Sequence, residues 1–351
     1  MALDSKHAAL RFDETGRRLR GEQALRIVMY ADRPASFGGI ETHMATLAKE
    51  LALLGQQVTL AFPRILEDGL FADAKAHGVR VVKAGPQEVQ ELAASGKVDV
   101  LHAHSARASR LAHALQRRYP LLTATTLHGP GQLLPPWRHG RTAIIAVSGE
   151  ISESLSQQGI PHITIENGVD LKRFHPRAPG LRRPRPLRIV YLGRVSPSKM
   201  PGLLALDQAA AFRQEVDVRY VADWAPRAQE APSPAVEHEL SGADLVFATG
   251  RGIREAMACG AAAAVLGVFW DGLVTPDTVS RLEWCNFSGR ASREPPTARR
   301  ISLLLRELLA DPKRLEQLKT FGASYARRHW DARVMAEKTL EVYQRLKREA
   351  S

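Results

Sequence analysis

The sequence is short of long apolar runs and of cysteine, and each shortage excludes a class of protein. No stretch of the 351 residues comes near the roughly 18 consecutive apolar residues of a membrane-spanning helix, so none is predicted. Cys259 and Cys285 are the only cysteines, which excludes a disulfide framework and a cysteine-rich metal site and favours a reducing compartment. Residues 1–23 carry charges throughout and lack an apolar segment, so we expect a polar leader rather than a secretory signal.

Acidic residues are the minority charge. Lys and Arg total 49 against 37 Asp and Glu, which gives a net charge of +12 and an isoelectric point near 10.0. This excess favours polyanionic partners such as a nucleotide diphosphate or an anionic membrane surface, although a basic surface that only maintains solubility is an alternative. The basic residues are scattered and no nucleic-acid-binding signature appears, so no nucleic-acid partner is expected.

Short apolar runs alternate with helical stretches through the first half. The apolar positions between Ile40 and Leu51 recur with the period of one helical face, and Gly55 then ends that helix. Strands alternating with helices are typical of a parallel sheet covered on both faces. We expect strands at 25–32, 57–62, 79–84, 98–105, 121–129 and 143–148.

The alternation stops at a stretch rich in Pro, Gly and Arg and then restarts. The restart predicts an α/β fold of two Rossmann-like domains. Strands are expected at 187–195, 216–223, 243–250 and 261–269, with a helix from Arg251 to Gly260 and helices from about residue 294 onward. The expected organisation is a leader at 1–23, a first domain at 24–170, a linker at 171–186, a second domain at 187–330 and a C-terminal helix at 331–351 able to pack back on the first domain.

A glycine pair follows the first predicted strand, in the motif SFGGIE. Gly38 and Gly39 would let backbone N–H groups approach a ligand closely at a helix N-terminus, which favours negative charge. A tight strand-to-helix turn without a ligand is the alternative. The motif is not the dinucleotide fingerprint, so a nicotinamide cofactor is not favoured.

Histidines stand at the carboxyl ends of two predicted strands. His128, in TLHGPG, lies where open α/β sheets place ligand contacts. His102 and His104 would point the same way from a strand, which suggests a metal pair. No third ligand is apparent, so two partly exposed imidazoles at a strand end are favoured and no metal site is expected.

Cations follow the first strand of the second half. In GRVSPSK, Gly193 allows a turn, while Arg194 and Lys199 suit a diphosphate, although both could be ordinary surface cations. Glu255 lies near the start of the next predicted helix, where it could accept hydrogen bonds from ribose hydroxyls or merely complement the helix dipole. Backbone amides around Gly252 and Ile253 could face phosphate there.

Taken in order, these motifs and four others resemble glycosyltransferase family 4, whose B-type fold has two Rossmann-like domains facing each other across a cleft. The motifs are FGGIETHMATLAKEL, VDVLHAHS, TLHGPG, IIAVSGEISESL, IENGVDLKRFHP, IVYLGRVSPSK and REAMACG. The resemblance places Gly38 and Gly39 near the donor diphosphate and has His128 face the donor sugar. It gives Arg194 and Lys199 the neutralisation of the departing diphosphate, without a metal, and makes Glu255 the second glutamate of the E-x7-E motif.

The chain departs from this family in three places. Phe247 stands where the first glutamate of E-x7-E, which serves the donor sugar, is expected. The segment from Asp223 to Ala243, which supplies part of the base pocket, is short. Asp271 and Gly272 only approximately replace the glycine pair and glutamate that follow REAMACG. We therefore expect altered donor handling or binding without turnover.

The resemblance implies a retaining, hexosyltransferase-like enzyme that moves a sugar from a nucleotide-diphosphate donor to a hydroxyl acceptor. No cofactor is expected beyond the donor itself, for which a UDP-sugar is favoured and a GDP-sugar is the alternative. The acceptor is a glycan, a lipid-linked compound or a small molecule. The expected location is the cytoplasm, with contact at the inner membrane face as an option. A non-catalytic, partner-dependent nucleotide-sugar-binding subunit and a sugar-nucleotide epimerase are the alternatives.

Overall fold

The computed structural model describes residues 23–131, 141–177, 186–211, 214–222 and 235–350. Three expectations fall wholly or partly outside these residues: the polar leader, part of the linker, and most of the short segment that begins at Asp223. Among the described residues, no helix combines the length and the apolar character required to cross a bilayer.

The first half forms a sheet whose strands all pair in parallel, in the order β3-β2-β1-β4-β5-β6-β7. Its order reverses beside β1, and a ligand crevice is expected at the carboxyl ends of strands at such a switch point. The strands are β1 (Arg26–Tyr30), β2 (Gln57–Phe62), β3 (Arg80–Lys83), β4 (Val100–Ala103), β5 (Leu122–Leu127), β6 (Thr142–Ala146) and β7 (Ile163–Thr164). The helices are α1 (Gly39–Leu53), η1 (Asp68–Phe71), α2 (Ala72–Ala76), α3 (Pro86–Ala94), α4 (Ala106–Gln116) and α5 (Gly149–Gln157).

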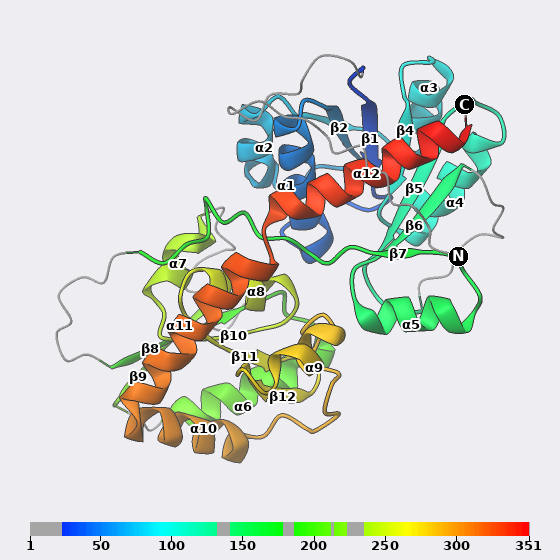
Figure 1. Cartoon of the computed structure of the whole chain (residues 1–351). Helices are drawn as coiled ribbons and strands as arrows, with labels where there is room; N and C mark the ends of the chain where they lie inside the picture. Colours follow the sequence, from blue (N-terminus) through cyan, green and yellow to red (C-terminus); the bar gives the residue numbers. More distant parts are fainter. Residues whose placement is uncertain (1–22, 132–140, 178–185, 212–213, 223–234, 351) are drawn as a thin grey trace, which may run out of the picture.

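The second half forms a separate sheet in the order β12-β11-β10-β8-β9. Its strands are β8 (Leu187–Leu192), β9 (Val216–Val221), β10 (Leu245–Ala248), β11 (Ala262–Leu266) and β12 (Trp270–Leu273). Its helices are η2 (Pro197–Lys199), α6 (Met200–Ala210), α7 (Val236–Gly242), α8 (Arg251–Ala258), α9 (Val279–Trp284), α10 (Ala298–Ala310) and α11 (Pro312–His329). The edge strand β12, absent from the sequence expectations, pairs antiparallel with β11 because the chain turns straight back after it. The predicted fold of two Rossmann-like halves is confirmed (Figure 1).

Local sequence accounts for most of these elements. The strands β4, β5, β10 and β11 are buried along their whole length, as expected for parallel strands covered on both faces. Helix starts carry side-chain caps, since Ser105 and Ser148 accept hydrogen bonds from the first turns of α4 and α5. Each cap follows a strand directly, so these helices begin at the carboxyl edge of the sheet.

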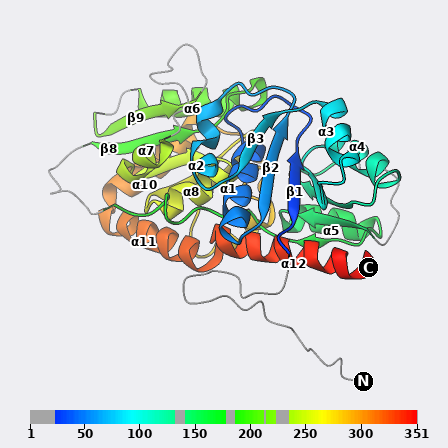
Figure 2. The ribbon, with the colours of Figure 1, turned by 90° about the horizontal axis from the view of Figure 1, so that it is seen from above.

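The chain crosses between the halves twice. After α11, the last helix α12 (Ala332–Ala350) returns to the first half, where Leu340 and Tyr343 join the core beneath α1 (Figures 1 and 2). The two crossings lie side by side, because Val169 N–H donates to Trp330 O at 2.7 Å and Ala332 N–H donates to Val169 O at 3.0 Å. These hydrogen bonds tie the two halves together, and we call residues 168–170 and 330–332 the double crossing.

Candidate functional site

The carboxyl ends of both sheets open onto one cavity of about 710 Å³, the central pocket. The first half contributes residues 37–42 and 128–131, which follow β1 and β5. The second half contributes residues 192–194, at the end of β8, and 249–252, which follow β10. The central pocket thus lies where a ligand crevice is expected in open α/β sheets, and both halves line it.

Most of the residues singled out in the sequence meet in this pocket. Ile253 does not, because its side chain is fully buried in the core beside α8 and its N–H donates to Gly250 O at 3.3 Å. The residues that line the central pocket are Gly38, Gly39, His128, Gly193, Arg194, Lys199, Gly252 and Glu255.

Arg194 reaches across the pocket to the glycine loop of the first half. Its Nη2 donates to Ser36 Oγ at 2.9 Å and to Phe37 O at 2.8 Å. A Cβ atom on Gly38 would lie 2.8 Å from that same Nη2 and 2.5 Å from Glu41 Oε2, so a side chain there would displace the ends of both side chains. Nothing lies within 4 Å of a Cβ on Gly39, so no packing contact in the structure requires glycine there.

Lys199 lies beside the start of α8. Its ammonium donates to Thr249 Oγ1 at 3.0 Å. Only Thr249 and Gly250 connect β10 to α8, and Gly250 has a φ of 61°, a backbone conformation that favours glycine. This short connection brings the lysine, the exposed guanidinium of Arg194 and the first turn of α8 to the same wall of the pocket.

Glu255 is already held by a neighbouring cation. It is 8% exposed, and Arg251 Nη2 lies 3.2 Å from its Oε1. Burial raises the pKa of Glu255, although Arg251 opposes that rise. Arg251 also donates to Gly168 O at 2.9 Å and to Thr46 Oγ1 at 3.1 Å, so it connects α8 to the double crossing and to α1. Arg251 was not among the predicted site residues, although it stands at the first position of the predicted helix.

A second charged pair lines the central pocket and was not predicted from the sequence. Arg33 follows β1, Glu41 lies in the first turn of α1, and Arg33 Nε lies 2.9 Å from Glu41 Oε1. Glu41 is fully buried, yet both residues line the central pocket. The signal available in the sequence was their position, since charged residues that directly follow a strand or a glycine pair lie at the ligand edge of such a sheet.

The expectation that His102 and His104 are partly exposed is wrong, because both are fully buried. His102 Nδ1 bonds Tyr343 of α12 at 2.6 Å, and its Nε2 bonds Thr126 Oγ1 at 2.8 Å. The carboxyl end of β4 is covered, with Tyr343 of α12 against His102, which strand alternation alone could not show.

No third ligand was expected for the pair His102 and His104, and the histidines that converge in the structure are a different group, which includes His104 but not His102. His104 Nδ1 lies 3.1 Å from His128 Nε2, and His43 of α1 stacks edge-on against His128 with ring centroids 4.9 Å apart. His43 Nδ1 bonds Asn167 Oδ1 at 2.8 Å. We call His43, His104 and His128 the histidine triad. The spacing of the sequence does not reveal it, because the three residues come from helix α1 and from the ends of two different strands.

The imidazoles around the pocket are held neutral. Burial lowers the pKa of His128 to about 3, and the positive charges of Arg251 and Arg33 act in the same direction. Burial likewise lowers the pKa of His102 to about 3 and that of His43 and His104 well below the usual range. At neutral pH, His128 therefore presents a neutral ring to the central pocket.

Phe247 does not replace a carboxylate inside the pocket. It lies within β10 between Tyr191 of β8 and Ala264 of β11, fully buried, with its ring centroid 6.2 Å from that of Trp270. Asp271 is likewise structural, because it accepts hydrogen bonds from the backbone N–H groups of Ala291 and Ser292 and does not line the pocket. The departure from the family pattern is therefore a short β10–α8 connection without a carboxylate, not an aromatic ring in the site.

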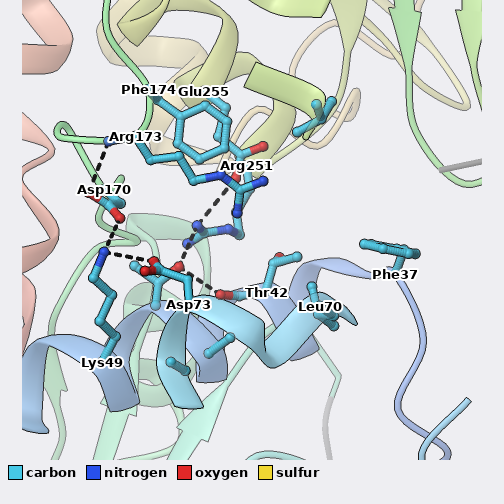
Figure 3. Close-up of a pocket in the computed structure, with 14 residues that line it drawn as sticks. Phe37, Thr42, Lys49, Leu70, Asp73, Asp170, Arg173, Phe174, Arg251 and Glu255 are labelled. Atoms are coloured by element: carbon cyan, nitrogen blue, oxygen red, sulfur yellow. Dashed lines mark hydrogen bonds and ion pairs between the residues drawn. The ribbon is translucent and has the colours of Figure 1, made fainter. Parts of the chain in front are cut away.

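A smaller cavity of about 80 Å³ adjoins the central pocket and shares Arg251 and Glu255 with it (Figure 3). Lys49 lies at its side, 2.6 Å from Asp170 Oδ2 and 2.7 Å from Asp73 Oδ2. These charged pairs connect α1 to α2 and to the double crossing. The charged residues that line this cavity therefore have a structural role.

Comparison with known proteins agrees with this architecture. Residues 37–173 match the sequence model of Glycosyltransferase Family 4, and no curated protein sequence matches the chain. A glycosyltransferase from Rickettsia africae superposes with a TM-score of 0.67 at 15% identity, over 92% of this chain and 98% of that one. Anabaena HepE in complex with UDP-glucose superposes at 0.65 and 16% identity, over 91% and 99% of the two chains.

A third similar structure is the sucrose-phosphate synthase of Thermosynechococcus elongatus, with a TM-score of 0.66 at 16% identity over 92% of this chain and 99% of that one. At these identities the structures establish the fold, which is the two-domain glycosyltransferase fold. The family match confirms the resemblance to family 4 over residues 37–173.

Proposed function

We propose that this chain is a glycosyltransferase that moves a sugar from a nucleotide-diphosphate sugar to a hydroxyl acceptor. The observation that carries the proposal is the central pocket, in which Arg194 and Lys199 face the Gly38–Gly39 loop across a shared space. Its volume of about 710 Å³ is in the usual range for a small-molecule site.

The departing diphosphate would lie between the glycine loop and the second half. Arg194 offers a guanidinium fork and Lys199 a compact ammonium, both suited to phosphate oxygens. Because Arg194 already donates to Ser36 and Phe37, its guanidinium is held in place before the donor arrives. Preorganised cations of this kind stabilise the negative charge that develops on the leaving group.

The reaction would proceed with retention and without a metal, through an oxocarbenium-like transition state. The bond from the anomeric carbon to the diphosphate oxygen breaks and its electron pair leaves with the diphosphate. The acceptor oxygen bonds to the anomeric carbon on the same face, and the hydroxyl proton passes to the departing diphosphate. His128 would orient the sugar through a neutral ring nitrogen. Glu255 would accept a hydrogen bond from a ribose hydroxyl, with its carboxylate held by Arg251.

A UDP-sugar is the favoured donor and a GDP-sugar the alternative; the superposition on HepE with UDP-glucose supports this choice.

The short β10–α8 connection favours one alternative, a non-catalytic nucleotide-sugar-binding subunit. It brings no carboxylate to the sugar end of the pocket, so the donor sugar would lack that partner. Such a subunit would bind donor without turnover. An epimerase on the same fold would instead turn over donor without an acceptor.

A thermal-shift screen against UDP, GDP, ADP, CMP and their sugar conjugates tests the proposal, first in chelator and without added metal. A ligand at about 100 times its dissociation constant adds roughly 2.7 kcal/mol to stability. One base should stand out, and its sugar conjugate should then be consumed when acceptors are supplied. Consumption without acceptor would favour the epimerase, and tight binding without consumption would favour the subunit. No shift with any nucleotide would contradict all three.

The acceptor is proposed only as a hydroxyl compound, either lipid-linked or water-soluble. The net charge of +12 would draw the chain to an anionic membrane that presents a lipid-linked acceptor. Sedimentation with anionic vesicles at low and high salt tests this, because electrostatic adsorption weakens as the Debye length shrinks. Neutral vesicles are the control.

A further inference from the structure

We propose that the histidine triad, His43, His104 and His128, is a binding site for a divalent transition-metal ion of the zinc type. The site lies beside the central pocket and goes beyond the proposed sugar transfer, which uses no metal. A bound ion would inhibit sugar transfer rather than catalyse it, because it would occupy His128, the ring proposed to face the donor sugar.

The three rings converge from separate parts of the first half. His43 lies on α1, His104 follows β4 and His128 follows β5, and one nitrogen from each lies within 4.8 Å of the others. His104 Nδ1 and His128 Nε2 are 3.1 Å apart. Two imidazole nitrogens at about 2.0–2.1 Å from one tetrahedral zinc ion are roughly 3.4 Å apart, so a small adjustment would admit the ion.

Two nitrogens of the triad are buried without a partner among the described residues, His43 Nε2 and His104 Nε2. A buried polar atom without a hydrogen bond costs free energy, and a structure normally satisfies it. A metal ion bound by His43 Nε2 would satisfy one of these atoms directly. No group among the described residues forms a hydrogen bond with His43 Nε2.

The surroundings fix the ring orientation that a ligand needs. Asn167 Nδ2 donates to Asn286 Oδ1 at 3.2 Å, which leaves Asn167 Oδ1 to accept from His43 Nδ1 at 2.8 Å. The hydrogen of His43 is therefore on Nδ1, and the lone pair is on Nε2, toward the triad. Oxygen acceptors behind metal-binding imidazoles commonly have this role.

The donor set selects the class of ion. Three imidazoles, with no carboxylate in the group, suit Zn²⁺, Co²⁺, Ni²⁺ or Cu²⁺ rather than Mg²⁺ or Ca²⁺. His128 is half-buried and lines the central pocket, so the remaining coordination position would open toward that pocket. An ion there and a donor sugar would compete for His128.

Cobalt titration of the whole chain tests the site, because tetrahedral cobalt bound by nitrogen absorbs visible light. We expect one equivalent to bind with that spectrum, and zinc to displace it. His43→Gln should abolish the spectrum, and Asn167→Ala should weaken binding about 10–100-fold, the usual effect of removing such a partner. His238→Gln, at an exposed histidine, is the matched control and should bind as the unchanged chain does.

Circular dichroism and thermal unfolding of each variant show whether it is folded; should His43→Gln fail to fold, Asn167→Ala carries the comparison. Absence of a cobalt spectrum in the unchanged chain overturns the site. So does cobalt binding by the His43→Gln and Asn167→Ala variants that is as tight as binding by the unchanged chain. The cobalt titration uses no sugar donor or acceptor. Its result can therefore be interpreted even if the proposed sugar transfer is not observed. Where transfer is measurable, zinc should inhibit it, and the Asn167→Ala variant should need about 10–100-fold more zinc for the same fractional inhibition.

Discussion

At the scale of single residues, Arg194 has two tasks that the structure brings together. It is exposed at the pocket wall, and it also bonds the loop that holds Gly38. A cation that is anchored before the ligand arrives loses little freedom on binding, which is the condition for stabilising a developing charge. Lys199, bonded to Thr249, is placed on the same wall.

Arg194→Ala should therefore lower kcat/KM about 10²–10³-fold, the usual cost of removing one preorganised donor, while the fold persists. Steady-state kinetics with the donor found in the thermal screen give the measurement. Arg107→Ala, at an exposed arginine on α4, is the matched control and should leave the rate unchanged. An unimpaired Arg194→Ala enzyme would rule out this role for the residue.

At the scale of elements, ion pairs hold α1 and α8 to the segment that joins the two halves. Lys49 of α1 is 7% exposed and Asp170 is 6% exposed, so neither charge is well solvated. The Asp170 carboxyl also accepts hydrogen bonds from Lys172 N and Arg173 N. Despite burial, Lys49 and these two backbone groups lower the pKa of Asp170.

Lys49→Ala should destabilise the chain by about 3–5 kcal/mol, because it leaves Asp170 buried without its cation. Urea unfolding followed by circular dichroism measures the change. Lys75→Ala is the matched control: its pair with Asp68 is well exposed, and such pairs contribute about 0–1 kcal/mol. Equal unfolding midpoints for the two variants would contradict the role of Lys49.

A second element-scale prediction concerns pH. Glu166 and Glu283 share the guanidinium of Arg254, at 3.6 Å and 2.9 Å. Although the Glu166 side chain is 42% exposed, its partial desolvation raises its pKa to about 7, with Arg254 opposing the rise and Glu283 adding to it. The folded pKa of Glu166 exceeds the unfolded value of 4.5. The stability that depends on protonated Glu166 is therefore fully present below about pH 4.5 and is lost as pH rises through about 7.

Glu166→Gln keeps the neutral form at every pH. The variant should match the unchanged chain near pH 5, and its stability should fall less between pH 5 and pH 8. Thermal unfolding across that range provides the test, with Glu67→Gln, at an exposed carboxyl, as the control. Parallel pH profiles for the Glu166→Gln variant and the unchanged chain would exclude this titration.

At the scale of the whole molecule, the double crossing determines how the two halves meet. Gly168 lies against the start of α12, and a Cβ there would be only 2.5 Å from Ala332 Cα. Backbone cannot yield as a flexible side chain can, so the close approach requires glycine. Arg251 bonds Gly168 O from the other side, so the double crossing is continuous with the pocket wall.

Gly168→Ala should destabilise the chain by about 1–3 kcal/mol, the usual cost of overpacking, and should loosen the contact of α12 with the first half. Thermal unfolding and hydrogen exchange in α12 measure both effects. Gly69→Ala is the control, since a Cβ there meets nothing within 4 Å. Unchanged exchange in α12 would show that the double crossing tolerates the added methyl group.

Much of this molecule follows from local patterns in the chain. The runs around Ile27, Val58 and Ile189 determine strands, and the glycine pair at Gly38 determines a strand-to-helix loop, because periodicity and turn chemistry depend on neighbouring residues. The placement of His128, Arg194 and Lys199 at strand ends follows in the same way, since parallel strands all end at one edge of a sheet.

Other features were decided only when distant segments met. His43 and His104 come together because β1 and β4 are neighbours in the sheet, a pairing that no spacing in the sequence reveals. Phe247 is inside β10 rather than in the pocket because pairing on both sides, with β8 and β11, carries the strand past that residue. The pairing of Arg251 with Glu255 and Gly168 depends on the double crossing. Strand order and the packing between the two halves are cooperative properties of the whole chain, and local sequence leaves them open.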